Sequence, residues 1–260
     1  MRPWILAETN YAHVRDFSYE VAVLPLGATE PHNLHLPYGT DTLEADAIGT
    51  RVCEAAWNLG AKVVMLPAIP YGTETNQARC RLSINVNPST LGMVIRDIVN
   101  SLAGHGVRKL VLLNSHGGNE FKPLLRELMG STSVHLFLCD WFRGLSGDAQ
   151  QEIFDEPGDH AGEMETSLAL ACFPHLVRMT PDGRLAADAG ATAPTRFEAV
   201  NRGWVSITRP WHLLTTNTGA GNPFAATSDR GEQLIRVIVD RLSVFLFELS
   251  EAKLDDRFPF

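Results

Sequence analysis

The feature that most constrains the fold of this chain is the alternation of short apolar runs with longer amphipathic ones. The apolar runs, each ended by glycine, proline or polar residues, predict buried strands at 21–28, 62–72, 108–114 and 133–141. Helical spacing is found at 40–60, 87–106, 121–130, 160–173 and 227–251. Strands that alternate with such helices favour a parallel sheet covered on both faces. We therefore expect an α/β fold, a three-layer α/β/α sandwich with a mostly parallel central sheet.

No linker or internal repeat divides the 260 residues. Since α/β domains often reach this size undivided, we expect a single domain over 1–260. The range 183–203 is rich in Ala and Gly with weak periodicity, which predicts a long loop directed toward the site or a subunit partner. The range 204–223 suggests further extended segments.

The composition excludes several classes of partner. The net charge is -8 and no basic stripe occurs, so nucleic acid is not expected. No apolar run reaches the roughly 18 residues needed to span a bilayer, and the first ten residues do not form a secretory signal. The cysteines form no CxxC pair and each lies in or beside an apolar segment. We expect no membrane partner and a cytoplasmic location.

The stretch GATEPHNLHLPYGTD, residues 27–41, follows the first predicted strand. Alternate side chains of an extended segment point to the same side, so Glu30 and His32 can face one cation. Asp41 stands at a helix start, from where its carboxylate can reach back to the strand end. Mixed His and carboxylate ligation suits Zn, Mn or Fe. The alternative is a polar turn with a helix-capping Asp41, and His35, which lies off the alternation, is expected to be structural.

The stretch NSHGGNE, residues 114–120, repeats this arrangement. His116 lies between an apolar strand and two glycines, Gly117 and Gly118, where backbone can approach a ligand closely. In such sheets ligands bind outside the carboxyl ends of the strands, so His116 is expected on the same edge as the first stretch. Taken alone, it is better explained as a turn histidine.

A third cluster, DHAGEMETS, begins a predicted helix with His160, Glu163 and Glu165. Carboxylates at a helix start are favoured by the helix dipole, which offers a structural explanation. The two glutamates are two residues apart and point about 200° apart on a helix, so they are not expected to share a role. The conjunction of three such clusters predicts a metal site. Trp211 and His212 are the other pair of interest.

These three segments resemble the signature segments of the creatininase (creatinine amidohydrolase) family, and LPAIPYG and GNPFAATSDRGEQLI also fit its pattern. The resemblance spans nearly the whole chain. It implies two divalent metal ions per subunit, with zinc first and manganese or iron as alternatives. It also implies hydrolysis of a non-peptide C–N bond, of the cyclic amide or formamide type, through a two-metal-activated water, and a homo-oligomer such as a hexamer.

Carried over by position, the resemblance assigns roles to individual residues. Glu30 and His116 would hold one metal, and His32 the other, with Asp41 bridging. His160 would be catalytic, and Glu163 is a second candidate for proton delivery. The last metal ligand is expected to be Glu165, with Glu163 as its rival. Beyond these assignments, the backbone N–H groups of Gly117 and Gly118 would support the oxyanion. From their positions, Asn119, Thr40 and Thr166 are expected to orient ligands.

The chain departs from creatininase itself at the glycine pair. Creatininase has a tyrosine and a metal-binding glutamate where this chain has Gly117 and Gly118, so creatinine is not the expected substrate. Relatives with two glycines here include formamide hydrolases and a peptide-maturation protease. The function expected is hydrolysis of a small-molecule amide. The alternatives are a creatininase-family peptidase and a catalytically silent or regulatory metal-binding relative.

Overall fold

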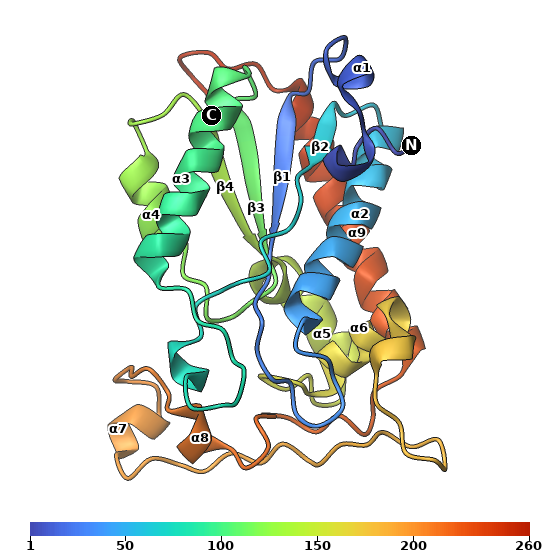
Figure 1. Cartoon of the computed structure of the whole chain (residues 1–260), viewed down its shortest axis with the longest axis vertical. Helices are drawn as coiled ribbons and strands as arrows, with labels where there is room; N and C mark the ends of the chain where they lie inside the picture. Colours follow the sequence, from blue (N-terminus) through green and yellow to red (C-terminus); the bar gives the residue numbers. More distant parts are fainter.

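The computed structural model describes residues 1–260 and contains a four-stranded parallel sheet in the order β2-β1-β3-β4 (Figure 1). The strands are β1 (Val21–Leu26), β2 (Val63–Met65), β3 (Lys109–Asn114) and β4 (His135–Asp140). Register pairs Val21 with Val63 on one side and with Lys109 on the other. The predicted parallel sheet is confirmed, and β1 lies in its centre.

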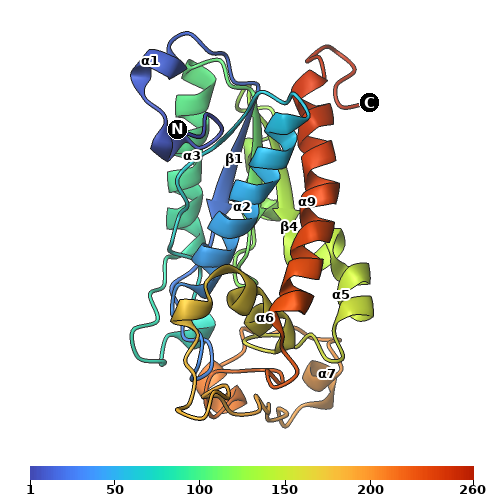
Figure 2. The same cartoon turned by 90° about the vertical axis from the view of Figure 1, so that its right-hand side faces the viewer.

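Helices cover both faces of the sheet, as Figure 2 shows, so the expected three-layer sandwich is confirmed. One face carries α2 (Thr40–Asn58), α5 (Gly147–Ile153), α6 (Glu163–Cys172) and α9 (Ser228–Glu251). The other face carries α3 (Pro88–Gly104) and α4 (Lys122–Leu128). The remaining helices are the short α1 (Tyr11–Val14), α7 (Glu198–Asn201) and α8 (Trp211–Leu214).

The alternation of side chains along β1 builds the two cores. Val21 and Val23 belong to the core shared with α2 and α9, whereas Ala22 and Leu24 belong to the core shared with α3. All six residues of β1 are buried. A continuous apolar run is what a strand covered on both faces requires, which is why the strand could be recognised without an alternating pattern.

Two expectations about the elements were wrong. The second strand ends at Met65 rather than running to residue 72, because Pro67 and Pro70 have no N–H to donate to a ladder. The range 204–223 forms no strand, and α8 lies where extended chain was expected. Outside α8, the β-type pairing of this range consists of isolated bridges, such as the one between Thr192 and Thr215.

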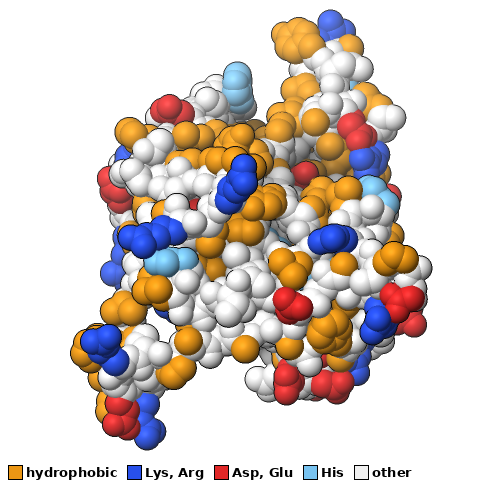
Figure 3. All heavy atoms as spheres, turned by 60° about the horizontal axis from the view of Figure 1, so that its bottom comes forward, with side chains coloured by type: hydrophobic (Ala, Val, Ile, Leu, Met, Phe, Trp, Pro, Cys, Tyr) orange, Lys and Arg blue, Asp and Glu red, His pale blue; other side chains and the backbone are white.

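The long segment between α6 and α9 crosses the molecule beyond the carboxyl ends of the strands, at the bottom of Figure 1. Figure 3 looks toward this end, where basic side chains are scattered among hydrophobic, uncharged and acidic groups and form no continuous patch. None of the helices has the combination of length and apolar character needed to cross a membrane.

Candidate metal centre

The three polar clusters meet at the carboxyl edge of the sheet. Glu30 and His32 lie in the loop after β1, and Asp41 lies in the first turn of α2. His116 lies two residues after the end of β3, and Glu165 lies in the first turn of α6. Parallel strands bring their carboxyl ends to one edge, so segments more than a hundred residues apart in the chain supply one site.

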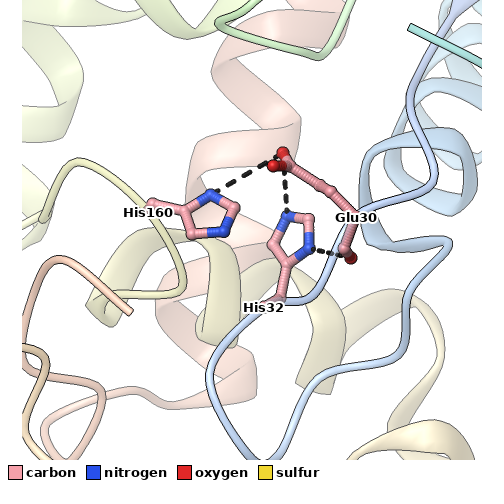
Figure 4. A group of neighbouring side chains, drawn as sticks. All are labelled: Glu30, His32 and His160. Atoms are coloured by element: carbon pink, nitrogen blue, oxygen red, sulfur yellow. Dashed lines mark hydrogen bonds and ion pairs between the residues drawn. The ribbon is translucent and has the colours of Figure 1, made fainter. Parts of the chain in front are cut away.

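Glu30 stands between histidines of two different segments. Its Oε1 lies 3.9 Å from Nε2 of His32 and 3.8 Å from Nδ1 of His160, as Figure 4 shows. Nδ1 of His32 lies 3.0 Å from the Glu30 carbonyl oxygen, to which it donates in the matching tautomer. With Nδ1 engaged in this way, Nε2 of His32, which faces Asp41, is the nitrogen that would bind a cation.

Asp41 faces two histidines with its two oxygens. Its Oδ1 lies 3.1 Å from Nε2 of His32, and its Oδ2 lies 3.2 Å from Nδ1 of His116. Nδ1 of His116 is also 3.0 Å from Oε1 of Glu30. The first turn of α2 therefore places one carboxylate between two imidazole nitrogens, one on each side.

Glu74 lies on the far side of the His116 ring. Its Oε1 is 2.5 Å from Nε2 of His116, which also lies 3.2 Å from the carbonyl oxygen of Thr73. Glu74 is fully buried. A carboxylate on the outer nitrogen of a metal-binding histidine fixes its tautomer and its orientation. The sequence reasoning missed Glu74, although it stands in a third polar turn at this edge of the sheet.

Burial and charge together shift the pKa values of this cluster. Burial opposes the ionised form of Asp41, yet His32 and His116 hold the pKa of that carboxyl well below its usual range. Burial raises the pKa of Glu30, assisted by the charge of Asp41. Burial would lower the pKa of His32 and His116, but the neighbouring carboxylates raise both well above the ordinary value.

His160 differs from the other histidines of the cluster. Burial, and then the charge of His32, lower the pKa of His160 to about 3, so the ring is neutral at neutral pH. Its Nε2 lies 3.0 Å from the carbonyl oxygen of Pro31, which favours the Nε2–H tautomer. Nδ1 then carries a lone pair directed toward Glu30, and the Trp211 ring packs edge-on against the imidazole.

Glu163 and Glu165 point in different directions from α6. Glu165 groups with His32 and Asp41, with ligand atoms within 4.8 Å of one another. Burial, together with the charge of Asp41 and against that of His32, raises the pKa of Glu165 to about 7. The Glu163 carboxylate instead accepts hydrogen bonds from Arg230 and from the backbone N–H of Glu156. The structure thus brings Glu165, and not Glu163, to the cluster.

The glycine pair lies against His116. A Cβ on Gly118 would lie 2.5 Å from the Thr73 carbonyl oxygen and closer still to Nε2 of His116, whereas a Cβ on Gly117 would meet nothing within 4 Å. Both glycines line the cavity above the cluster, and neither backbone N–H makes a hydrogen bond within the chain. Gly118 is therefore required for close packing, and both N–H groups are without a partner in the chain.

The remaining expected residues support loops. Asn119 accepts a hydrogen bond from the Thr73 backbone N–H and donates to Asn114, so it holds the segment that carries Glu74. Thr40 donates to the carbonyl oxygen of Pro37 and fixes the turn before α2. The hydroxyl of Thr166 lies 2.8 Å from Nε2 of His35, outside the cluster.

A cavity of about 300 Å³ opens over the cluster. Its walls include aromatic side chains of Trp141, Phe142 and Trp211, while Gln77 donates a hydrogen bond to Glu30 at its floor. His212 is exposed and takes no part. Gln77 was also missed from the sequence, since glutamine carries no signal of its own.

The side chains of the cluster offer histidine nitrogens and carboxylate oxygens, which are suitable ligands for divalent cations. Oδ2 of Asp41 and Oε1 of Glu74 are buried and contact His116 without hydrogen-bond geometry, and Oε2 of Glu74 is buried with no hydrogen-bond partner. The carboxyl of Glu44, one turn further along α2, is buried without a partner as well, and burial and the charges of Glu165 and Asp41 raise its pKa. Buried charges are tolerated when they are paired or bind metal. Three groups of His and carboxylate side chains each have their ligand atoms within 4.8 Å of one another. These are donor types that Zn, Mn and Fe accept.

Fold and site together define an α/β/α protein with a buried His/carboxylate cluster, a candidate metal centre, at the carboxyl edge of a parallel sheet. A family model described as Creatininase, creatinine amidohydrolase, matches residues 7–246. The chain belongs to the creatininase family and is, at that level, a metal-binding hydrolase. The family resemblance predicted from the sequence is confirmed.

Individual relatives span most of the chain. The mycofactocin precursor peptide peptidase of Mycobacterium tuberculosis H37Rv is 30% identical over 225 residues, which cover 84% of this chain and 81% of the relative. A crystal structure from Bacteroides fragilis, of a candidate creatinine amidohydrolase, is 32% identical with a TM-score of 0.90, covering 98% of this chain and 100% of that one. A manganese form of creatininase has a TM-score of 0.74 at 22% identity over 96% of this chain and 100% of that one, and it shows the shared fold.

Proposed function

We propose that this protein is a metal-dependent amidohydrolase with two divalent ions per subunit, zinc first, with manganese or iron as alternatives. The placement of Asp41 carries the proposal, because its two oxygens face Nε2 of His32 and Nδ1 of His116. A carboxylate in that position can bridge two cations. Glu30 and His116 would complete one site, and His32 and Glu165 the other.

Cations bound there would polarise a substrate carbonyl and acidify water. The protein's own groups do the rest. Nδ1 of His160, which faces Glu30, would take a proton from water and return it to the leaving nitrogen, although burial lowers the pKa of the ring to about 3 and makes it a weak base. The free backbone N–H groups of Gly117 and Gly118 donate hydrogen bonds to the developing oxyanion. Glu74 holds His116 in one tautomer. Glu163 has no place in this scheme, since Arg230 occupies it.

The reaction proposed is hydrolysis of a C–N bond in a small amide of the cyclic amide or formamide type. The small cavity favours a small molecule. Cleavage of a peptide is the second candidate, and the likeness to mycofactocin precursor peptide peptidases over 84% of this chain favours it. We further propose that the whole chain acts as one domain, in a homo-oligomer.

Metal analysis and a substrate panel test the proposal together. Purified protein is expected to hold one to two equivalents of transition metal per chain, and Asp41→Ala is expected to lose most of it. The panel contains cyclic amides, formamides and short peptides, each assayed before and after chelation. Full metal retention in the Asp41→Ala variant would remove the bridging role. Metal binding without turnover of any panel member would identify a catalytically silent relative.

A further inference from the structure

Arg143 lies at the mouth of the cavity, directly after β4. It belongs to the turn Trp141–Leu145, and its Nη2 lies 3.4 Å from the carbonyl oxygen of Gly117, one residue beyond the cluster histidine His116. Its guanidinium is 5.3 Å from the centre of the Phe142 ring. The cation is therefore held beside the oxyanion turn by backbone and aromatic contacts.

The donors of Arg143 are largely unused. Its Nη1 forms only a loose ion pair with Asp140, 3.6 Å from Oδ2 and beyond hydrogen-bonding distance, while Oδ1 of Asp140 accepts a hydrogen bond of 2.7 Å from Asn114. The side chain of Arg143 is 54% exposed. A guanidinium with open donors at a cavity mouth can receive an anion from the cavity.

Arg209, the other cation of the cavity wall, is engaged differently. Its Nη1 lies 2.6 Å from Asp159, and its guanidinium lies 4.6 Å from the centre of the Trp211 ring. Asp159 therefore compensates its charge. Of the two arginines that line the cavity, Arg143 has the looser ion pair, 3.6 Å from Asp140 against 2.6 Å between Arg209 and Asp159.

We propose that Arg143 binds a carboxylate of the substrate, so that the protein prefers amides carrying a free carboxylate beyond the scissile C–N bond. The planar fork of a guanidinium matches a carboxylate in two parallel hydrogen bonds. This assignment rests on the proposed function for its substrate class. It makes Arg143 a specificity-determining residue at the cavity mouth. The carboxylates of the His/carboxylate cluster would bind the cations and not the substrate carboxylate.

Binding of a matched pair of probes tests the proposal without turnover. Levulinate carries a ketone and a carboxylate, and acetonylacetone replaces that carboxylate by a neutral methyl ketone; neither contains a C–N bond. Calorimetry on the zinc-loaded protein is expected to show levulinate binding about tenfold more tightly, the effect of one charge-assisted hydrogen-bonded pair at a half-exposed site. Arg143→Gln is expected to remove the preference and Arg143→Lys to retain part of it.

The matched control is Arg96→Gln, which alters an exposed arginine paired with Glu127 on the far side of the sheet and should keep the preference. The proposal is overturned if the wild type shows no preference. It is also overturned if the preference for levulinate persists in Arg143→Gln. If that remaining preference disappears on metal removal, the carboxylate binds at the metals instead. Inorganic phosphate competing more strongly than levulinate would overturn the assignment to a carboxylate. Failure of the proposed function is separate, because it appears as absent turnover across the amide panel.

Discussion

Glu74 and Glu30 contact opposite nitrogens of the same imidazole: Nε2 of His116 lies 2.5 Å from Glu74, and Nδ1 lies 3.0 Å from Glu30. The ring therefore presents Nδ1 to the centre of the cluster. The orientation depends on a carboxylate that is itself shielded from water, since Glu74 is fully buried. We therefore expect Glu74, whose ligand atom lies within 4.8 Å of those of Glu30 and His116, to influence metal affinity.

Replacing Glu74 by Gln should weaken zinc binding about 10- to 100-fold, because an amide holds the His116 tautomer less strongly than a carboxylate. Zinc affinity would be measured by competition with a chelating dye. Glu120→Gln is the control, since Glu120 is exposed in the following turn. Unchanged zinc affinity in Glu74→Gln would show that Glu74 does not position His116.

Gly118→Ala should disturb the same histidine through contact alone. The added Cβ would lie 2.5 Å from the Thr73 carbonyl oxygen. Relief of this overlap is expected to cost about 1–3 kcal/mol of unfolding free energy and to weaken zinc binding. Gly117→Ala is the matched control, because a Cβ there meets nothing within 4 Å. Denaturant unfolding of both variants compares them, and equal stability would contradict the prediction.

Substituting the two glutamates of α6, Glu163 and Glu165, should have different effects on metal content and on stability. Glu165→Gln is expected to lower the metal content, because Glu165 groups with His32 and Asp41. Glu163→Gln is expected to keep the metal but to lose about 1.5–3 kcal/mol of stability, since it weakens a buried charged hydrogen bond to Arg230. Elemental analysis and urea unfolding measure the two effects. Metal loss in Glu163→Gln instead would reverse the assignment.

Zinc binding at neutral pH should release protons. The pKa values of His32 and His116 are raised by neighbouring carboxylates, so both rings are protonated in the metal-free protein. Groups with raised pKa values stabilise the metal-free fold fully below the unfolded pKa of about 6.5, and this contribution is lost as pH rises through the folded value. Metal needs neutral imidazole, so zinc affinity should increase with pH. Calorimetry in buffers of different ionisation enthalpy should detect at least one proton released; no release would contradict the raised values.

His160→Gln should lower kcat about 10²- to 10⁴-fold while leaving the zinc content unchanged, if Nδ1 transfers a proton rather than binding metal. The ring is neutral at neutral pH, and because burial lowers its pKa to about 3 it is a weak base, so this substitution tests the proton-transfer role directly. Turnover and elemental analysis are measured on the same preparation. Loss of zinc would place His160 among the ligands, together with Glu30 and His32.

The sequence by itself determined the layers and the ligand types. The continuous apolar run of β1 requires cover on both faces, and the clusters at strand ends had to meet at one edge of a parallel sheet. It also separated Glu163 from Glu165, because helical geometry directs them apart. The sequence did not predict the structure of 204–223. No apolar pattern in this range distinguishes extended chain from the short helix α8.

Only the tertiary structure decided which groups face one another. Glu74 and Gln77 belong to a turn with no ligand pattern, and their approach to His116 and Glu30 depends on how the chain after β2 packs beside the turn after β3. The choice of Glu165 over Glu163 was likewise decided by Arg230, a residue from another helix. Side-chain identity defines what a residue can bind, but burial and neighbours distant in the chain set its pKa and its partner.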